Sequence, residues 1–374
     1  MTGTGTTTFP VTDAALEDLR ARVRTTRWGP TWPGASWDLG TDESTLRDLA
    51  AHWADGFDWR AAERNVLSRP GCEVDLDGVP VHVDVFAAES PEALPLILTN
   101  GWPSTSLELR PLARRLARPS QHGGRSADAF TVVIPSLPGF PFSPQRPEPD
   151  SRIHELWHRI MAELGFDRYG AHGGDLGAGI TSRLAEAHPE AVVGIHLLSV
   201  AAPARLASTP SPDEEAHLAR VTRWNEIEGS YQHQQQQRPL TLAPALSDSP
   251  VGLLSWILEK HRNWSDCDGN VFRRFDRDYL LTVASLYWFE NCISTSFRPY
   301  AEFASGMTPR VSRVEVPTAV AVFPRDLAGP PREWAERVYN VTRYSRMPRG
   351  GHFAPHEEPE LLAADITAFF RDLR

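Results

Sequence analysis

The residues whose types and spacing could do chemistry centre on one acid, Asp175, in the stretch Tyr169-Gly-Ala-His-Gly-Gly-Asp-Leu-Gly-Ala-Gly-Ile180. The pattern predicts a short strand before the acid, at 166–171, and a helix after it, at 180–187. A glycine-lined turn from strand to helix lifts its central side chain out of the sheet, as in the nucleophile elbow. An aspartate there attacks carbon and forms an ester that a second step hydrolyses. The alternative is a glycine-rich loop whose aspartate caps the helix.

Two groups nearer the C-terminus could complete a catalytic triad with this acid. His352 stands in Arg-Gly-Gly-His-Phe, where glycines leave the imidazole free to point into a site, and Asp326 follows an apolar run. The order nucleophile, acid, histidine is that of the α/β-hydrolase sheet. His352 would take a proton from water while Asp326 fixes its tautomer. The alternatives are a loop histidine bonded to backbone and an aspartate that caps a helix.

A turn at Asn100-Gly-Trp-Pro103 follows the first buried apolar run. A Gly-X-Pro turn in this place can aim backbone N–H groups into a site as an oxyanion hole. The alternative is an ordinary turn that ends a strand.

Two groups of histidines have spacings that resemble those of metal ligands. His154-Glu-Leu-Trp-His158 matches the H-E-x-x-H pattern of zinc proteases, but no convincing third ligand follows it. We interpret this stretch as an outer helix of the sheet. His352, His356 and Glu357 are also close in sequence, but His356 precedes a helix start, so we predict no metal there either.

The elements that must position these residues indicate an α/β protein. Continuous apolar runs at 94–98, 131–134, 192–198 and 318–323 alternate with helical segments, which is typical of a mostly parallel sheet covered by helices. An alternating stretch at 73–85, with Asp77-Gly78 as its turn, predicts an antiparallel hairpin.

Two further segments lie outside this alternation. Amphipathic patterns at 13–24 and 44–53 predict N-terminal helices that pack on the main body. A helical stretch at about 206–305 is a candidate lid, and a plain polar loop is the alternative for its glutamine-rich tract at 232–237.

Composition limits the partners of the chain. The 374 residues carry a net charge of −10, which argues against nucleic acid or an anionic membrane as the main partner. Three distant cysteines, Cys72, Cys267 and Cys292, indicate a reducing compartment without a disulfide framework. The start of the sequence has no signal-peptide pattern, and no apolar run is long enough to span a membrane, so we expect a cytoplasmic protein.

Motifs spread over nearly the whole chain resemble those of the microsomal-type epoxide hydrolases, a family of the α/β-hydrolase fold. These motifs are Phe57-Asp-Trp-Arg60, Gly101-Trp-Pro103, Ile134-Pro-Ser-Leu-Pro-Gly-Phe140, the Gly-Gly-Asp175 elbow, Ser247-Asp-Ser-Pro-Val-Gly-Leu253, Leu286-Tyr-Trp288 and Pro348-Arg-Gly-Gly-His352. The resemblance implies an N-terminal helical wrapping segment at 1–70, a hydrolase core at 71–205 and 306–374, and a helical cap at 206–305. It is compatible with a homodimer.

The resemblance also implies roles for individual residues. It makes Asp175 the nucleophile, Asp326 the acid and His352 the base, and it places the two lid tyrosines of the family on Tyr231 and Tyr300. The oxyanion hole would use the backbone N–H groups of Trp102 and Leu176. We expect Asn100, Pro103 and Leu176 to line the substrate pocket.

Two positions depart from the family pattern. Asn100 stands where the family usually has histidine, and Leu176 stands where it usually has tryptophan. Both changes bear on substrate choice and on the acceptor in the second step, whereas the triad and both tyrosines are intact.

The sequence therefore predicts an epoxide hydrolase that needs only its substrate and water, with no metal or organic cofactor. Three alternatives stay open: a haloalkane dehalogenase, an enzyme that opens epoxides with a nucleophile other than water, and a non-catalytic binding protein on the same scaffold. A dehalogenase would need halide-binding donors, which Asn100 and Trp102 could supply.

Overall fold

The computed structural model describes residues 9–68, 70–203, 209–327 and 329–374. These residues form an eight-stranded sheet with the order β1-β2-β4-β3-β5-β6-β7-β8. The first two pairings along this order, β1 with β2 and β2 with β4, are antiparallel, and all later ones are parallel. The strands are β1 Gly71–Leu76, β2 Val79–Phe86, β3 Leu94–Thr99, β4 Phe130–Pro135, β5 Tyr169–Gly173, β6 Val192–Leu197, β7 Val314–Val322 and β8 Tyr339–Arg346.

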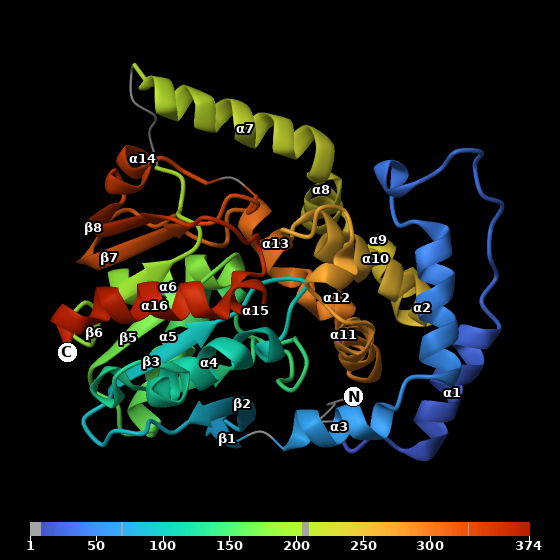
Figure 1. The fold of residues 1–374 in the computed structure, drawn as a ribbon, viewed down its shortest axis with the longest axis horizontal. Coiled ribbons are helices and arrows are strands. Elements are labelled where there is room, and N and C mark those ends of the chain that lie inside the picture. Colours follow the sequence, from blue (N-terminus) through green and yellow to red (C-terminus); the bar gives the residue numbers. More distant parts are fainter. Residues whose placement is uncertain (1–8, 69, 204–208, 328) are drawn as a thin grey trace.

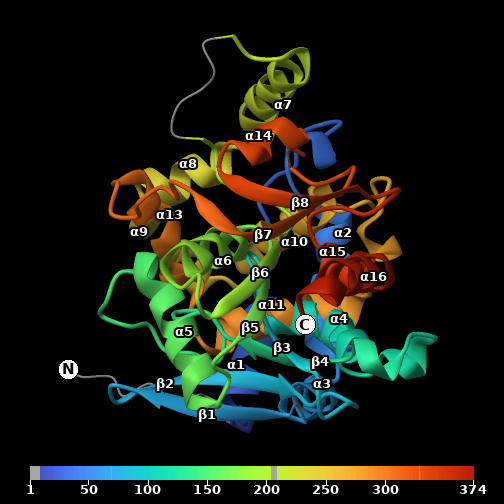
Figure 2. The same ribbon diagram turned by 90° about the vertical axis from the view of Figure 1, so that its left-hand side faces the viewer.

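Helices cover both faces of this sheet, as Figure 2 shows, with α5 and α6 on one side and α4 and α16 on the other. The helices of this part are α4 Arg110–Ala117, α5 Ile153–Glu163, α6 Leu176–Ala187, α14 Arg332–Glu336, α15 Ala354–Glu357 and α16 Pro359–Phe370. The continuous apolar runs became strands buried on both faces, which confirms the predicted α/β architecture.

The predicted hairpin is also confirmed. β1 and β2 pair through Leu76 and Val79, and the two turn residues, Asp77 and Gly78, have φ values of 59° and 78°. Positive φ at both central residues is the geometry of a type I′ turn, which Asp-Gly favours.

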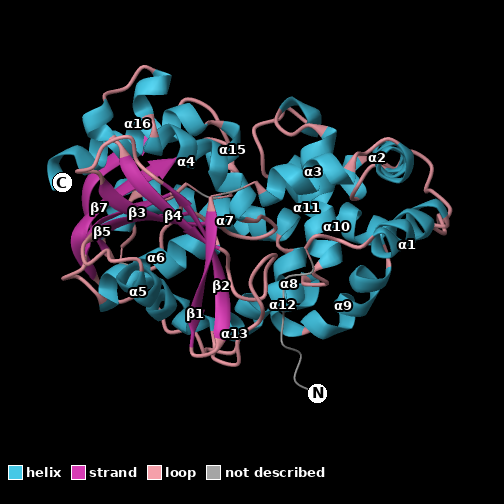
Figure 3. Ribbon diagram, turned by 90° about the horizontal axis from the view of Figure 1, so that it is seen from below, coloured by secondary structure: helices cyan, strands magenta, loops and turns pink. Residues whose placement is uncertain are grey.

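In the described residues between β6 and β7, seven α-helices follow one another, and the chain continues from them into β7. They are α7 Pro212–Glu228, α8 Ser230–Gln237, α9 Pro239–Asp248, α10 Pro250–Asn263, α11 Arg277–Phe289, α12 Ile293–Ser296 and α13 Arg298–Ala304. We call this group the cap; Figure 3 shows it beside the sheet as the helical half of the molecule. The expected boundary between core and cap at 205/206 lies outside the described residues.

For one element of the cap, the structure excludes the alternative considered from the sequence. The tract at 232–237 lies within α8 and is helical, not a polar loop. α8 packs against α13 and buries Tyr231 and Gln235, so tertiary contacts stabilise a helix of 8 residues that is too short to be stable alone.

The N-terminal helices are α1 Asp13–Arg24, which the Thr12 side chain caps, α2 Glu43–Asp55 and α3 Trp59–Leu67. Of these, α1 and α2 lie against the cap on the side away from the sheet, and α3 leads back to β1 (Figure 1). From α2, the buried Trp53 indole donates a hydrogen bond to Ser285 of α11 over 3.0 Å. Trp59 of α3 packs on Phe289, with ring centroids 4.9 Å apart.

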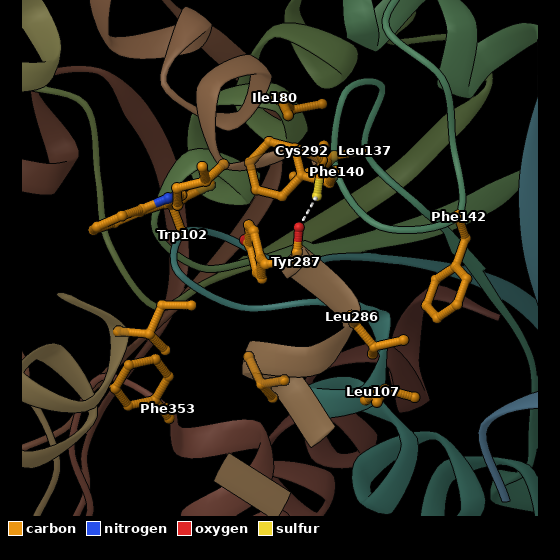
Figure 4. Close-up of a cluster of buried hydrophobic side chains, with 14 of the residues drawn as sticks. Trp102, Leu107, Leu137, Phe140, Phe142, Ile180, Leu286, Tyr287, Cys292 and Phe353 are labelled. Atoms are coloured by element: carbon orange, nitrogen blue, oxygen red, sulfur yellow. Dashed lines mark hydrogen bonds between the residues drawn. The ribbon is translucent and has the colours of Figure 1, made fainter. Parts of the chain in front are cut away.

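A single hydrophobic cluster joins the loops at the carboxyl ends of the strands to the cap. Figure 4 shows Trp102, Phe140 and Ile180 from the core beside Leu286 and Tyr287 from α11. The Tyr287 hydroxyl donates to the backbone oxygen of Ser104 over 2.9 Å. The cap is therefore fixed to the same edge of the sheet at which Asp175 emerges.

Candidate active site

Asp175 lies at a sharp turn between β5 and α6. Its φ and ψ are 50° and −125°, a strained conformation for a residue with a side chain, which costs of the order of 1–3 kcal/mol. The residue stands at the start of α6, but its side chain makes no capping hydrogen bond. The capping alternative is therefore wrong, and the carboxylate is available for other contacts.

The turn requires glycines because other backbone segments approach it closely. A Cβ atom at Gly177 would lie 2.2 Å from the Thr99 carbonyl oxygen, and one at Gly101 would lie 2.3 Å from the Asp175 Cβ atom. This close approach brings the backbone N–H of Trp102 within 2.9 Å of the Asp175 Oδ1 atom. Leu176 begins α6, so its N–H is one of those without an intrahelical acceptor.

The structure brings the three triad candidates together. His352 Nδ1 lies 2.7 Å from Asp326 Oδ1, and His352 Nε2 lies 3.7 Å from Asp175 Oδ2. The loops that carry the acid and the histidine are joined by a bridge in which the Arg325 N–H donates to the Gly350 oxygen over 3.1 Å. All three side chains are at most 16% exposed, so their charges interact with little screening from solvent.

These carboxylates control the protonation of the histidine. Burial alone would lower the pKa of His352, but the charges of Asp326, Asp175 and Glu108 outweigh it and raise the pKa to about 9. The resting site therefore holds a protonated imidazole between two carboxylates. Esterification removes the charge of Asp175 and would therefore remove part of the electrostatic stabilisation of the protonated imidazole.

The two tyrosines of the cap lie over this carboxylate. Tyr231 comes from α8 and Tyr300 from α13, and their rings meet edge to face with centroids 6.0 Å apart. The Tyr300 hydroxyl is buried and lacks a hydrogen bond of normal geometry among the described residues. Burial, and then the charge of Asp175, raises the pKa of both hydroxyls, so both are proton donors at neutral pH.

A cavity of about 430 Å³ brings these groups to a common space. Asp175, Leu176, Tyr231 and Tyr300 line it, and most of the remaining wall is apolar. A largely apolar pocket with a few convergent polar groups is typical of a small-molecule site.

A second, much smaller cavity of about 10 Å³ lies on the other side of Asp175. Asn100, Glu108 and His352 also line it. Its size is close to that needed by one water molecule, and its wall supplies several polar partners.

Of the residues expected in the substrate pocket, only Leu176 lines the large cavity. Asn100 lines the small one, where its Nδ2 donates to the Gly101 oxygen over 3.0 Å and its Oδ1 has no partner among the described residues. Pro103 is buried and lines neither.

Glu108 and Trp264 were not singled out from the sequence. Burial raises the pKa of the Glu108 carboxyl to about 7, although a hydrogen bond from Ser104 opposes this. The Trp264 carbonyl accepts the His352 N–H over 2.8 Å, and its ring packs edge-on against the imidazole. No local sequence motif identifies either residue, because their burial beside His352 depends on the packing of segments far apart in the sequence.

The H-E-x-x-H stretch lies in α5, on a face of the sheet. His158 stacks on His188 at 3.8 Å and contacts the Tyr169 hydroxyl, while Glu155 pairs with His188 over 3.1 Å. Among the residues that the structure describes, no group of three or more His, Cys, Asp or Glu side chains is arranged to hold a metal ion. Nor is any described helix both long and apolar enough to cross a membrane.

The sheet, the elbow and the acid–histidine pair define an α/β-hydrolase whose nucleophile position holds a carboxylate. The family described as "Epoxide hydrolase N terminus" matches residues 5–109, and "alpha/beta hydrolase fold" matches residues 95–243. A putative epoxide hydrolase of Stigmatella aurantiaca is 38% identical over 97% of this chain and 84% of its own length. The chain belongs to the epoxide hydrolase family.

Solved structures agree with this assignment. The epoxide hydrolase of Aspergillus niger superposes with a TM-score of 0.85 at 27% identity, covering 100% of this chain and 97% of that one. The juvenile hormone epoxide hydrolase of Bombyx mori does so with a TM-score of 0.88 at 26% identity, covering 98% and 93%. The fold and family implied by the sequence motifs are confirmed.

Proposed function

We propose that the chain hydrolyses epoxides to vicinal diols through a covalent ester on Asp175. The observation that carries this proposal is the placement of two protonated tyrosine hydroxyls, Tyr231 and Tyr300, in the same cavity as the carboxylate. An epoxide oxygen becomes an alkoxide as the ring opens, and an alkoxide leaves poorly unless a donor stabilises its charge.

In the first step, an oxygen of Asp175 attacks a ring carbon while the C–O bond of the epoxide breaks. The tyrosine hydroxyls hydrogen-bond the oxygen that becomes the alkoxide, and one of them gives this oxygen its proton and is then reprotonated from solvent. The Trp102 N–H, 2.9 Å from Asp175 Oδ1, holds the carboxylate in place during the attack. The product is a hydroxyalkyl ester of Asp175.

In the second step, water attacks the carbonyl carbon of this ester. His352, which releases its own proton to solvent once Asp175 is esterified, takes a proton from the water, and Asp326 stabilises the imidazolium that forms. The Trp102 and Leu176 N–H groups hold the oxyanion. The tetrahedral intermediate then collapses: the bond between the carbonyl carbon and the alkyl oxygen breaks, the imidazolium gives its proton to that oxygen, and the diol leaves with the Asp175 carboxylate restored. The cavity of about 10 Å³ beside Asp175, His352 and Glu108 supports this route, because it is where a single water would meet both the ester and the base.

The structure also bears on the dehalogenase alternative. Neither of the two residues that could bind a halide lines the large cavity, and each donates a hydrogen bond within the protein. Asn100 Nδ2 donates to the Gly101 oxygen, and Trp102 Nε1 donates to Ser296 Oγ over 3.1 Å. Both contacts favour the epoxide over the haloalkane as substrate.

A single-turnover experiment in ¹⁸O-labelled water tests the proposal with styrene-type, aliphatic and polycyclic epoxides. Attack by Asp175 leaves the first diol unlabelled and puts ¹⁸O into the Asp175 carboxylate, because water attacks the ester carbonyl. Direct attack of water on the epoxide would label the diol instead and would contradict the ester. Product mass reports an acceptor other than water, and halide release from haloalkanes reports dehalogenation.

We also propose the division into an N-terminal wrapping segment at 1–70, a core at 71–205 and 306–374, and a cap at 206–305. A cytoplasmic location and a homodimer stay predictions that fractionation and light scattering would test. The reaction as proposed needs no metal or cofactor, so prolonged dialysis against a chelator should leave its rate unchanged.

A further inference from the structure

Arg183 places a positive charge in the wall of the substrate cavity. The residue belongs to α6 and lines the cavity of about 430 Å³ together with Asp175, Tyr231 and Tyr300. Its side chain makes no hydrogen bond or ion pair with the described residues, and its Nε atom is buried without a partner. The triad and the tyrosines make no use of this cation.

The guanidinium lies against α6, which forms part of the cavity wall. Side chains of a helix lean toward its N-terminus, and here both terminal nitrogens of Arg183 come within 3.6 and 3.7 Å of the position that a Cβ atom would take at Gly179. Gly179 follows Asp175 by about one helical turn, which is about 5.4 Å of rise. The guanidinium therefore lies beside the first turn of α6, the helix that follows the elbow.

Arg183 is partly buried, and two fully buried arginines of the chain show how such a group is normally partnered. Arg110 contacts Asp84 and the Val66 oxygen, and Arg146 donates to the Leu76 and Val79 oxygens. A buried charge without a partner is costly, so such groups are normally paired. Arg183 lacks this compensation within the described part of the chain.

The nearest acid on the same helix does not fill this role. Glu186 accepts hydrogen bonds from the backbone N–H groups of Ser312 and Arg313 and from the Ser312 hydroxyl. Burial lowers the pKa of Arg183, and the neighbouring Tyr339 and Glu186 offset this only in part. The donors of the guanidinium are therefore free to bind a ligand in the cavity.

We propose that Arg183 binds a carboxylate of the substrate, so that the preferred epoxide carries an acidic group a few bonds from its ring. This inference rests on the proposed function, because it concerns the substrate of the same site. A guanidinium matches a carboxylate with two parallel hydrogen bonds, and a single cation balances a single negative charge. The apolar wall would contact the carbon chain that joins the acid to the epoxide.

Arg310 is a second arginine in the lining, but it is exposed to solvent. Water screens an exposed charge and reduces the value of its ion pair. Arg183 should therefore contribute most of the preference for an acidic substrate.

The test compares matched epoxides that differ only in a terminal carboxylate or its carboxamide, over a series of chain lengths. We expect the wild-type kcat/KM to favour the best carboxylate by roughly 10- to 100-fold, as is typical of a hydrogen bond to a charged group in a partly buried site. Arg183→Gln should remove this preference and keep turnover of the carboxamide, whereas Arg183→Lys should restore part of it. Arg27→Gln makes the same charge change at an exposed position outside the cavity and should change nothing.

Binding of unreactive analogues separates this inference from the proposed function. In cyclopropane analogues a CH₂ group replaces the epoxide oxygen, so calorimetry measures affinity without turnover. The carboxylate analogue should bind wild type at least 10-fold more tightly than its carboxamide, and Arg183→Gln should abolish the difference. No diol from any epoxide would contradict the proposed function alone. Equal binding of the two analogues, or a preference that survives in Arg183→Gln or is lost only in Arg310→Gln, would overturn the role of Arg183.

Discussion

The indole of Trp102 and the phenol ring of Tyr231 are stacked, with centroids 5.4 Å apart and planes within 5° of each other. Trp102 belongs to the turn that presents a backbone N–H to Asp175, whereas Tyr231 comes from the cap. The stack therefore links the group that orients the nucleophile to the group proposed to receive the epoxide oxygen. Tyr300 meets the same indole edge-on at 5.9 Å, so one ring positions both tyrosines.

Replacing this indole should slow ring opening. An aromatic pair contributes about 0.5–1.5 kcal/mol beyond its buried area, so Trp102→Leu should reduce the rate of ester formation by roughly 10-fold. The backbone N–H remains, so hydrolysis of the ester should change less. Rapid-quench kinetics separate the two steps, and Trp102→Phe is the matched control because it keeps a ring in the stack. Equal slowing of both steps would show that the indole supports the whole turn instead.

The two tyrosine hydroxyls should act together. Tyr231→Phe and Tyr300→Phe should each slow the formation of the Asp175 ester, and the double variant should slow it far more. A donor aimed at developing charge contributes about 2.7–4 kcal/mol in other enzymes, and one remaining phenol can partly replace the other. Single-turnover alkylation measures this effect. If the double variant forms the Asp175 ester at the wild-type rate, the two tyrosines contribute packing only.

The nucleophile and the base should be separable by mutation. Asp175→Ala should abolish turnover because no other atom can form the ester, whereas His352→Gln should form the ester and fail to hydrolyse it. After mixing with an epoxide, mass spectrometry should show a mass increase of one substrate for His352→Gln and no increase for Asp175→Ala. Thermal unfolding of both variants provides the control for folding.

The protonation of His352 should change during the reaction. Its pKa of about 9 in the resting enzyme exceeds the usual 6.5, although burial opposes this, because Asp326 and Asp175 are both charged. Ester formation removes the charge of Asp175, so the pKa should fall and the imidazole should become a base at neutral pH. We expect NMR titration of the free enzyme to give a value near 9 and single-turnover ester hydrolysis to follow a lower one. Hydrolysis that rises only through pH 9 would contradict this coupling.

The same shift has a consequence for stability. The folded pKa lies above the unfolded one, so the stabilisation by protonated His352 is complete below pH 6.5 and is lost as the pH rises through about 9. The difference in unfolding free energy between wild type and His352→Gln should shrink over this range, by at most about 1.4 kcal/mol per pH unit. Denaturant titrations at pH 6 and 9.5 measure this difference in unfolding free energy. A difference that grows with pH would contradict a raised pKa of His352 in the folded state.

Close packing at the elbow predicts a strong effect of one methyl group. In Gly101→Ala the new Cβ would lie 2.3 Å from the Asp175 Cβ atom, so the turn or the elbow must shift. A displacement of about 1 Å at a catalytic group can cost about 100-fold in rate. Gly29→Ala, which has open space around it, is the matched control and should keep full activity. An active Gly101→Ala enzyme would show that the elbow tolerates movement.

Local chemistry explains the parts of the fold that the sequence predicted. Asp77-Gly78 accepts positive φ at both positions, so the hairpin could be placed from two residues. Apolar runs marked four buried strands, although the elbow strand lies at 169–173 and not at 166–171. β8 was not predicted, because its exposed and half-buried positions carry charged residues and hide the β pattern.

The sequence by itself determined the types of reacting group, because an aspartate among glycines, a histidine on a glycine loop and the family motifs are all local features. Only the tertiary structure decided which groups meet. It joins Asp326 to His352 across 26 residues, sets two tyrosines from different cap helices over Asp175, and encloses Glu108 and Arg183 beside them. The physical reason is that contact and burial depend on how distant segments pack, and no local pattern of side chains records that packing.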